Sequence, residues 1–150
     1  AMTQYYNYCK SVALGSAGFL ASVGVYVKQN SAGATNSLRA GVWSDNGGSP
    51  GTPLAVGAMG TGALGYFPEL TSGVNAAAGW VHIPVGIWLT AATYWIGVMN
   101  GAAGLWLIYY DGSGSDKIIQ NSGDYISAGS TRWTISAPGN KYSIRANFLT

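Results

Sequence analysis

Only five side chains in this 150-residue chain carry a carboxylate, so any acid–base chemistry would have to be built from them. They are Asp45, Glu69, Asp111, Asp116 and Asp124. A glycosidase needs two such groups facing each other across about 5–10 Å. Three of the five stand in stretches rich in Gly and Ser, where Asp is favoured as a turn former. We therefore expect no catalytic pair and no enzyme.

The chain contains a single histidine, His82, and a single cysteine, Cys9. One histidine cannot form a His cluster for zinc, and no Ser-His-Asp triad can be recognised around it. His82 shares a strand face with Trp80, and we expect it to be a packed or surface residue. Cys9 has no partner for an internal disulfide. On a strand it is expected to be a small buried hydrophobe, with a reactive thiol as the alternative.

Two turn-like segments carry closely spaced oxygen donors. Residues 111–116 (DGSGSD) resemble a calcium loop, because hard cations are bound by several oxygens from neighbouring residues. This segment lacks the acidic density and the closing Glu of such loops, and Asp45-Asn46 has the same deficiency. We expect turns at both places, with calcium as the alternative, and no other metal or cofactor.

Aromatic residues are the strongest candidates for a binding function, with six Trp and ten Tyr in the chain. Aromatic rings stack on the apolar faces of pyranose rings, while Asn, Ser and Asp bind the hydroxyl groups. Alternation along the strands predicts that Trp43 and Tyr26 point outward, because Val42 and Val25 beside them point inward. For Trp95 two registers compete, one exposing the ring and one burying it. We predict a ligand site formed by Trp43, Tyr26 and Trp95, with core or subunit-interface packing as the alternative.

The elements that would hold these residues are short strands. Apolar and polar residues alternate in segments that recur every 8–12 residues or so, separated by turns rich in Gly, Asn, Ser and Pro. The strongest turn is SDNGGSPG at 44–51. Segments 93–99 and 104–110 are expected to pair as a hairpin, and the strand that begins at Trp80 is expected to end at Pro84. No convincing amphipathic helix is present. The sequence predicts an all-β fold, an antiparallel jelly-roll-like β-sandwich of about eight to ten strands.

Composition limits the class of protein. Charged residues make up 8% of the chain, against a usual share of about 25%. The Lys and Arg residues are scattered and the net charge is +2, so we expect no nucleic-acid partner. Apolar runs reach roughly half the length of a spanning helix, so we expect no membrane insertion. The length favours one domain over residues 1–150, with Ala1 as a cloning remnant.

Three stretches together resemble a known family: LRAGVWSDNGGSPGTPL, GWVHIPV and IWLTAATYWIGVM. The chain resembles the jelly-roll-like β-sandwich modules of bacterial surface and secreted proteins and of phage tail or virion proteins. In those modules a strand ends IYSDNGGxPGxL, a GWxx(V/I) strand follows, and an LxxGxxYW(I/L) strand comes next. Here Val42-Trp43 replaces the common Ile-Tyr, and Ala91-Ala92 replaces the Gly-bearing turn. The resemblance covers residues 5 to about 149 and implies architecture, with no shared functional residues to transfer.

These observations predict a non-catalytic binding or adhesion module of an extracellular, cell-surface or virion surface, with carbohydrate as its ligand. The alternative is a structural virion component (decoration, fibre or tail) or a surface-layer protein whose aromatics form subunit contacts. Low charge combined with exposed Trp and Tyr leaves apolar patches that monomers rarely tolerate. We therefore expect a homo-oligomer, with a trimer as one form it can take.

Overall fold

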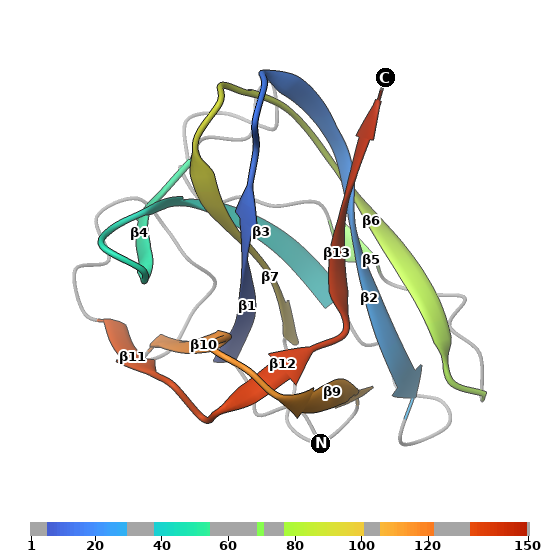
Figure 1. The fold of residues 1–150 in the computed structure, drawn as a ribbon. Helices are drawn as coiled ribbons and strands as arrows, with labels where there is room; N and C mark the ends of the chain where they lie inside the picture. The colour runs from blue at the N-terminus through green and yellow to red at the C-terminus, as the bar shows by residue number, and fades with distance from the viewer. Residues whose placement is uncertain are drawn as a thin grey trace.

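The computed structural model describes residues 6–29, 38–54, 69–70, 77–100, 106–121 and 133–149. These residues form thirteen β-strands, all paired antiparallel, and no helix. The strands lie in two layers that cross at an angle (Figure 1). The predicted all-β sandwich is confirmed. The strands are more numerous than the eight to ten expected because several are only two to four residues long.

The larger sheet has the order β11-β10-β1-β7-β3-β4, with β5 paired to β3. Its seven strands are β1 (Tyr6–Ala13), β3 (Leu38–Asp45), β4 (Pro50–Pro53), β5 (Glu69–Leu70), β7 (Thr93–Asn100), β10 (Lys117–Asn121) and β11 (Trp133–Ser136). Strand β7 lies between β1 and β3 and is hydrogen-bonded to both. Both faces of β7 are buried from Tyr94 to Met99, which is why its sequence is a continuous apolar run rather than an alternating one.

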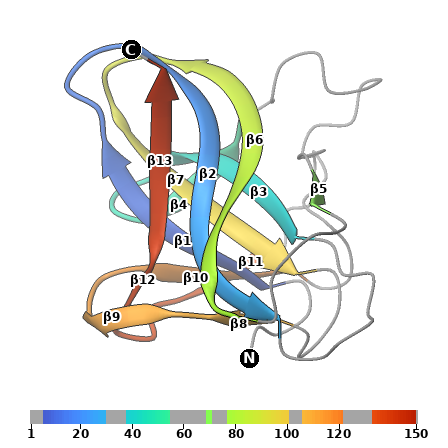
Figure 2. The same ribbon diagram turned by 90° about the vertical axis from the view of Figure 1, so that its right-hand side faces the viewer.

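The smaller sheet has the order β13-β2-β6, with β8 paired to β2. Its strands are β2 (Gly18–Gln29), β6 (Gly79–Leu89), β8 (Trp106–Ile108) and β13 (Ile144–Leu149). Figure 2 shows β13, β2 and β6 running in front of β1, β7 and β3. A separate two-stranded ribbon, β9 (Tyr110–Ser113) with β12 (Asn140–Tyr142), lies across one end of the sandwich (Figure 2).

The core lies between the two sheets, where β2, β6 and β13 contact β3, β7 and β1. One face of β2 contributes Val23, Val25 and Val27, which are fully buried. The larger sheet contributes apolar side chains that include Leu38, Val42, Ile96 and Val98. Burying an aliphatic side chain of this size contributes roughly 1.5–3 kcal/mol to stability, so this row of valines anchors the smaller sheet.

A register shift in β2 between Leu20 and Ser22 extends this packing. It occurs opposite β6 and opposite β13. Leu20 and Val23 are three positions apart and would point to opposite faces of a regular strand, yet both are fully buried. The shift is a β-bulge that keeps the apolar residues of β2 on one face.

Two expectations about strand pairing are wrong. Strand β6 continues through Pro84 to Leu89 instead of ending there, because β6 is an edge strand of the described sheet and a proline there costs no ladder hydrogen bond. Segment 104–110 does not pair with β7 as a hairpin. Its described strand, β8, pairs with β2, while both sides of β7 are taken by β1 and β3.

Candidate binding surface on the smaller sheet

The structure buries two of the three aromatic residues predicted to bind ligand. Trp43 is 0% exposed and Trp95 is 2% exposed. The prediction that Trp43 points into solvent is wrong, and of the two registers left open for Trp95 the burying one holds. A ring without an accessible face cannot stack on a sugar, so in this structure neither residue offers a platform.

The reason for the burial of Trp43 lies in two glycines. Gly41 and Gly97 are paired across β3 and β7, and the Trp43 indole lies over both. A Cβ at Gly41 would come within 2.5 Å of the Trp43 ring, and one at Gly97 within 3.0 Å. The alternation correctly predicted that Trp43 and Val42 lie on opposite faces of β3, but both faces are buried there, so lying opposite an inward residue does not mean exposure.

Asp45 joins the turn at the end of β3 to this buried aromatic layer. Its Oδ2 accepts a hydrogen bond from the Gly48 amide at 3.2 Å, as turn chemistry predicts. Its Oδ1 accepts one from Trp95 Nε1 at 2.7 Å. The carboxylate therefore satisfies the only polar atom of a ring that is otherwise packed among apolar neighbours, and the partner of Trp95 was not visible in the sequence.

The third predicted residue, Tyr26, lies on a different surface, the outer face of the smaller sheet. There Tyr26 is half-buried and stands directly opposite Trp80 across β2 and β6. The two rings pack edge to face with centroids 5.6 Å apart. Tyr109 packs on the other side of Tyr26 in the same manner, at 5.4 Å. Trp80 and Tyr109 are 41% and 38% exposed, so this aromatic row is open to solvent.

Polar residues continue the same face next to the aromatic row. Arg145, Gly24 and His82 are cross-strand neighbours on β13, β2 and β6. The Arg145 guanidinium lies over the Trp80 ring, with Cζ 4.1 Å from the centroid, and Arg145 Nη2 is 2.9 Å from His82 Nε2. Both side chains cross above Gly24, where a Cβ would come within 3.0 Å of each. The glycine makes room for this contact. We name Tyr26, Trp80, Tyr109, His82 and Arg145 the Arg145 surface.

His82 contacts Arg145 and Asn147 through its two ring nitrogens. A guanidinium only donates, so His82 Nε2 is the acceptor in its contact with Arg145. The side-chain amide nitrogen of Asn147 lies 3.0 Å from His82 Nδ1, and it donates to Ser22 Oγ at 3.0 Å and to the Ser22 carbonyl at 3.4 Å. Asn147 thus links His82 to Ser22 on β2.

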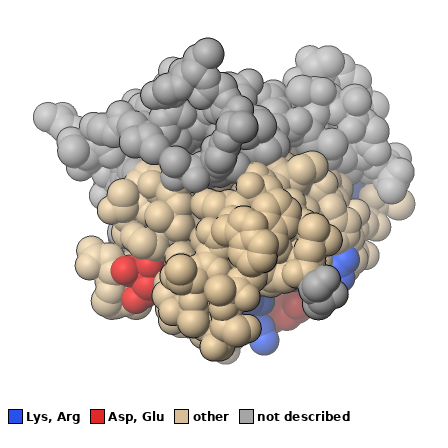
Figure 3. All heavy atoms as spheres, turned by 90° about the horizontal axis from the view of Figure 1, so that it is seen from above, with Lys and Arg blue, Asp and Glu red and all other residues tan. Residues whose placement is uncertain are grey.

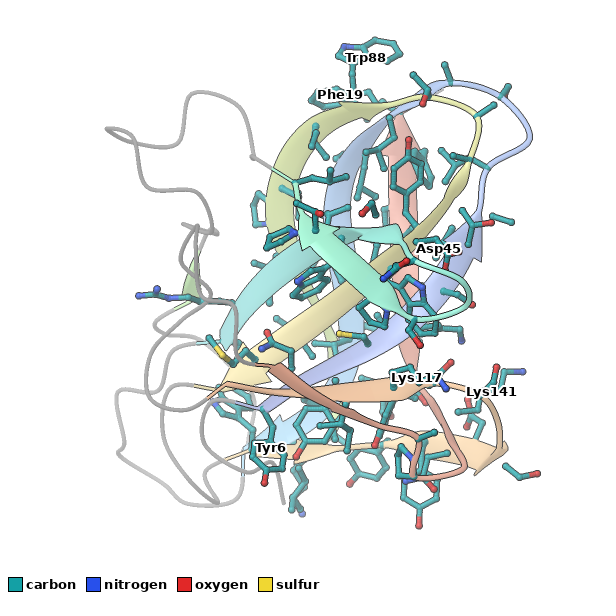
Figure 4. All side chains as sticks on the ribbon, turned by 90° about the vertical axis from the view of Figure 1, so that its left-hand side faces the viewer. Tyr6, Phe19, Asp45, Trp88, Lys117 and Lys141 are labelled. Carbon is teal, nitrogen blue, oxygen red and sulfur yellow. The ribbon has the colours of Figure 1, made fainter. Side chains whose placement is uncertain are left out.

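A second exposed patch lies at the far end of the same face. Leu149, Phe19 and Trp88 are cross-strand neighbours on β13, β2 and β6. Trp88 is 72% exposed, and it packs edge to face on Phe19 at 5.8 Å. Figure 4 shows the two rings projecting together from one end of the molecule. In the described part of that end, seen from above in Figure 3, charged atoms lie only near the rim. We name these three residues the Trp88 patch.

The two acidic residues of the calcium-like segment have separate partners. Asp111 Oδ2 accepts a hydrogen bond from the Ser143 hydroxyl at 3.1 Å, and Asp116 Oδ2 accepts one from the Tyr142 amide at 2.6 Å. Asp116 is 5% exposed, and burial raises its pKa, while the Tyr142 amide and the charges of Lys10 and Lys141 oppose that shift. Within the described ranges no three His, Cys, Asp or Glu side chains gather into a set that would hold a metal ion.

Cys9 is fully buried in the larger sheet, as expected of a small hydrophobe. Burial is the main cause that raises the pKa of its thiol well above the ordinary value, and the negative charge of Asp116 raises it further. A neutral thiol without solvent access is a poor nucleophile, so the reactive-thiol alternative does not fit this position.

Sequence reasoning missed Trp80, Tyr109 and Arg145 as members of a site. The alternation of Trp80 and His82 with Val81 and Ile83 did carry the signal for β6, and on the last strand Arg145 and Asn147 alternate in the same way with Ile144, Ala146 and Phe148. The alternation within each strand therefore predicts which of its residues share the outward face. What no single strand could reveal is that β13, β2 and β6 are neighbours, which is what brings the outward residues together.

Comparison with protein-family models, with curated proteins and with solved structures returns no match to this chain. The fold and the Arg145 surface are thus the basis for any functional assignment. Among the residues that the structure describes, no helix has the length and apolar character needed to cross a membrane.

Proposed function

We propose that this protein is a non-catalytic binding or adhesion module that recognises carbohydrate through the Arg145 surface. The observation that carries the proposal is the solvent-exposed row of Trp80, Tyr26 and Tyr109 on paired strands, with hydrogen-bonding side chains next to it. Exposed aromatic rings offer apolar faces to pyranose rings, and adjacent polar groups can bind the hydroxyls. Of the three residues first expected to bind, only Tyr26 remains in this proposal.

Rigidity of the platform supports a binding role. Tyr26 and Trp80 lie within long strands of the smaller sheet, and the main chain of Tyr109 donates to the Tyr26 carbonyl at 3.2 Å and accepts from the Ser143 amide at 3.0 Å. Side chains held in this way lose little conformational freedom when a ligand binds, which favours affinity.

The partners of the carboxylates support a non-catalytic role. Asp45 is bonded to Trp95, Asp111 to Ser143, and Asp116 to the Tyr142 amide. Each of these described carboxylates has a structural partner on a neighbouring segment. The low charge of the chain supports an extracellular, cell-surface or virion location, where uncharged polar and aromatic surfaces are common.

A glycan array followed by calorimetric titration of the strongest ligand tests the proposal. Trp80→Ala is expected to reduce affinity at least tenfold, since it removes the largest exposed ring of the row. The matched control is Trp88→Ala, which removes an exposed tryptophan from the same face of β6 roughly 25 Å away, at about 3.3 Å per residue. Equal binding by wild type and Trp80→Ala, or no binding to any glycan, would contradict the proposal.

A second candidate function is a structural virion or surface-layer component that assembles through its aromatic residues. The Trp88 patch favours it, because a tryptophan that is 72% exposed beside Phe19 and Leu149 is an unusual feature of an isolated monomer. Size-exclusion chromatography with light scattering tests this function. It predicts a homo-oligomer, a trimer being one form, that Trp88→Ser dissociates. A wild-type monomer at micromolar concentration would rule it out.

A further inference from the structure

We infer that the ligand of the Arg145 surface is an acidic saccharide, whose carboxylate or sulfate group binds the Arg145 guanidinium while its sugar ring packs on the neighbouring aromatics. This inference rests on the proposed function and adds the chemical class of the ligand. It begins from the position of one positive charge on a face of the molecule that has few charges.

The guanidinium of Arg145 is held in a defined place. Trp80 supports it from one side, with Cζ 4.1 Å from the ring centroid, and Nη2 donates to His82 Nε2 at 2.9 Å. Gly24 leaves open the space through which the side chain reaches both. An exposed arginine normally samples many rotamers, and ordering it costs entropy when a ligand binds. Because these contacts already fix the Arg145 side chain, that entropic cost is smaller here.

The charge of this guanidinium is not neutralised by the described residues. Among the side chains that the structure describes, no carboxylate forms an ion pair with Arg145, whose partners are the Trp80 ring and the His82 imidazole. A guanidinium has five N–H donors, and the contact with His82 uses one of them. The remaining donors form the planar fork that binds carboxylate or sulfate oxygens in pairs.

The aromatic row lies beside this fork. Arg145 covers part of Trp80, and the remaining exposed part of that ring and the exposed Tyr109 ring lie on the same face. A pyranose ring can therefore contact the aromatics while an acidic substituent on it reaches the guanidinium. A neutral saccharide would use the aromatics alone and leave the cation unpaired, so the geometry favours the acidic form.

The test uses pairs of oligosaccharides that differ only in charge. The probes are a galacturonate hexamer beside its methyl ester, and a sulfated galactan hexamer beside its desulfated form. These two arms also distinguish carboxylate from sulfate as the anionic group. We expect wild type to bind the acidic member of at least one pair about tenfold more tightly than the neutral member, because a pair of charge-assisted hydrogen bonds contributes an affinity difference of that size. That preference should weaken as salt concentration rises.

Variants separate the role of the charge from the role of the rings. Arg145→Gln should abolish the preference for the acidic member while keeping the weaker binding of the neutral one, and Arg145→Lys should retain part of the preference. Lys141→Gln, which removes an exposed cation outside the Arg145 surface, is the control for net charge. Thermal melts of each variant verify that it is folded.

The outcomes are distinct. Equal affinity of wild type for the acidic and neutral members overturns the inference and leaves carbohydrate binding intact. Binding to neither member of either pair, together with an array without signal, overturns both. A single-stranded oligonucleotide is included because bases also stack on exposed aromatics. Tighter binding of that oligonucleotide than of any saccharide would overturn the inference as well.

Discussion

The central strands of the larger sheet and strand β6 of the smaller sheet differ in how they hold tryptophan. Trp43 and Trp95 are cross-strand neighbours on β3 and β7 and are almost completely buried, whereas Trp80 and Trp88 on β6 are exposed. Both faces of β3 and β7 are buried around the first pair, while the outer face of β6 is open to solvent. Trp106 on β8, which also belongs to the smaller sheet, is buried like the first pair. Trp43 and Trp95 thus serve stability, and Trp80 and Trp88 are accessible from solvent.

The strongest test of this contrast is truncation of one tryptophan from each sheet. Trp43→Ala should lower the free energy of unfolding by about 3–5 kcal/mol, because a fully buried ring leaves a cavity over Gly41 and Gly97. Trp88→Ala should change it by less than about 0.5 kcal/mol, since the ring is mostly in solvent. Urea denaturation followed by circular dichroism measures both values. Similar losses for the two variants would remove the distinction between the sheets.

Substitution of one glycine in each sheet tests the same contrast between the buried and the open face, with a smaller expected loss of stability. A Cβ at Gly97 would come within 2.7 Å of Cys9 Sγ and 2.8 Å of the Tyr8 carbonyl, and a backbone atom inside a sheet cannot move away. Gly97→Ala is therefore expected to destabilise the protein by about 1–3 kcal/mol. The atoms nearest to a Cβ at Gly24 would belong to the side chains of Arg145 and His82, two exposed residues whose side chains can move.

Gly24→Ala should accordingly leave the unfolding midpoint in urea nearly unchanged and weaken ligand binding, because it displaces the guanidinium from His82. The pair of variants thus separates a stability effect on the larger sheet from a binding effect on the smaller one. A Gly24→Ala protein that unfolds as early as Gly97→Ala would show that the Arg145 surface is also a major source of stability.

Asp45 provides a third test, on the polar support of the buried layer. Asp45→Ala leaves the Trp95 indole N–H without its acceptor inside the larger sheet, and it also removes the contact with the Gly48 amide. A loss of about 1–3 kcal/mol is expected in urea denaturation. The control is Asp111→Ala, which removes an acceptor from the exposed Ser143 hydroxyl and should cost less than about 0.5 kcal/mol. A reversed order would contradict the role of Asp45 as the acceptor that supports the buried Trp95 ring.

The smallest effect concerns pH and the buried Asp116. Its pKa in the folded protein is raised above the ordinary value of 3.8, chiefly by burial. Below pH 3.8 the carboxyl is protonated in both folded and unfolded chains, and its burial carries no penalty for charge. As the pH rises through the folded pKa, the folded protein must ionise a buried group that the unfolded chain ionises more easily. The contribution of Asp116 to stability therefore decreases with increasing pH.

Asp116→Asn isolates this contribution, because its amide oxygen can still accept from the Tyr142 amide. The free energy of unfolding of the variant minus that of wild type should increase from acidic to neutral pH, measured by urea denaturation at several pH values. A difference that instead increases toward acidic pH would mean that Asp116 stabilises the fold as a carboxylate through Lys10 and Lys141.

Several elements were predictable from the sequence because they depend on residues that are neighbours in the chain. The alternation in β2 and β6 and the turn after β3 follow from the side chains themselves, and they led to an antiparallel all-β sandwich. Tyr26 was placed on an outward face for the same reason. The continuation of β6 through Pro84 was missed because it depends on β6 having only one described neighbour in its sheet. The partner of β8 was missed because both edges of β7 are occupied by strands distant in sequence.

The sequence by itself determined which residues of each strand share a face, since a period of two is a property of the extended backbone. It also determined the turns, which depend on the side chains and backbone freedom of neighbouring residues. Only the tertiary structure decided that both faces of β3 are buried at Val42 and Trp43, while one face of β2 is open to solvent. Burial depends on what packs against a face, and the contact of Arg145 with Trp80 and His82 joins residues more than sixty positions apart in sequence. The same alternating pattern therefore became a buried aromatic layer in one sheet and an exposed aromatic face in the other.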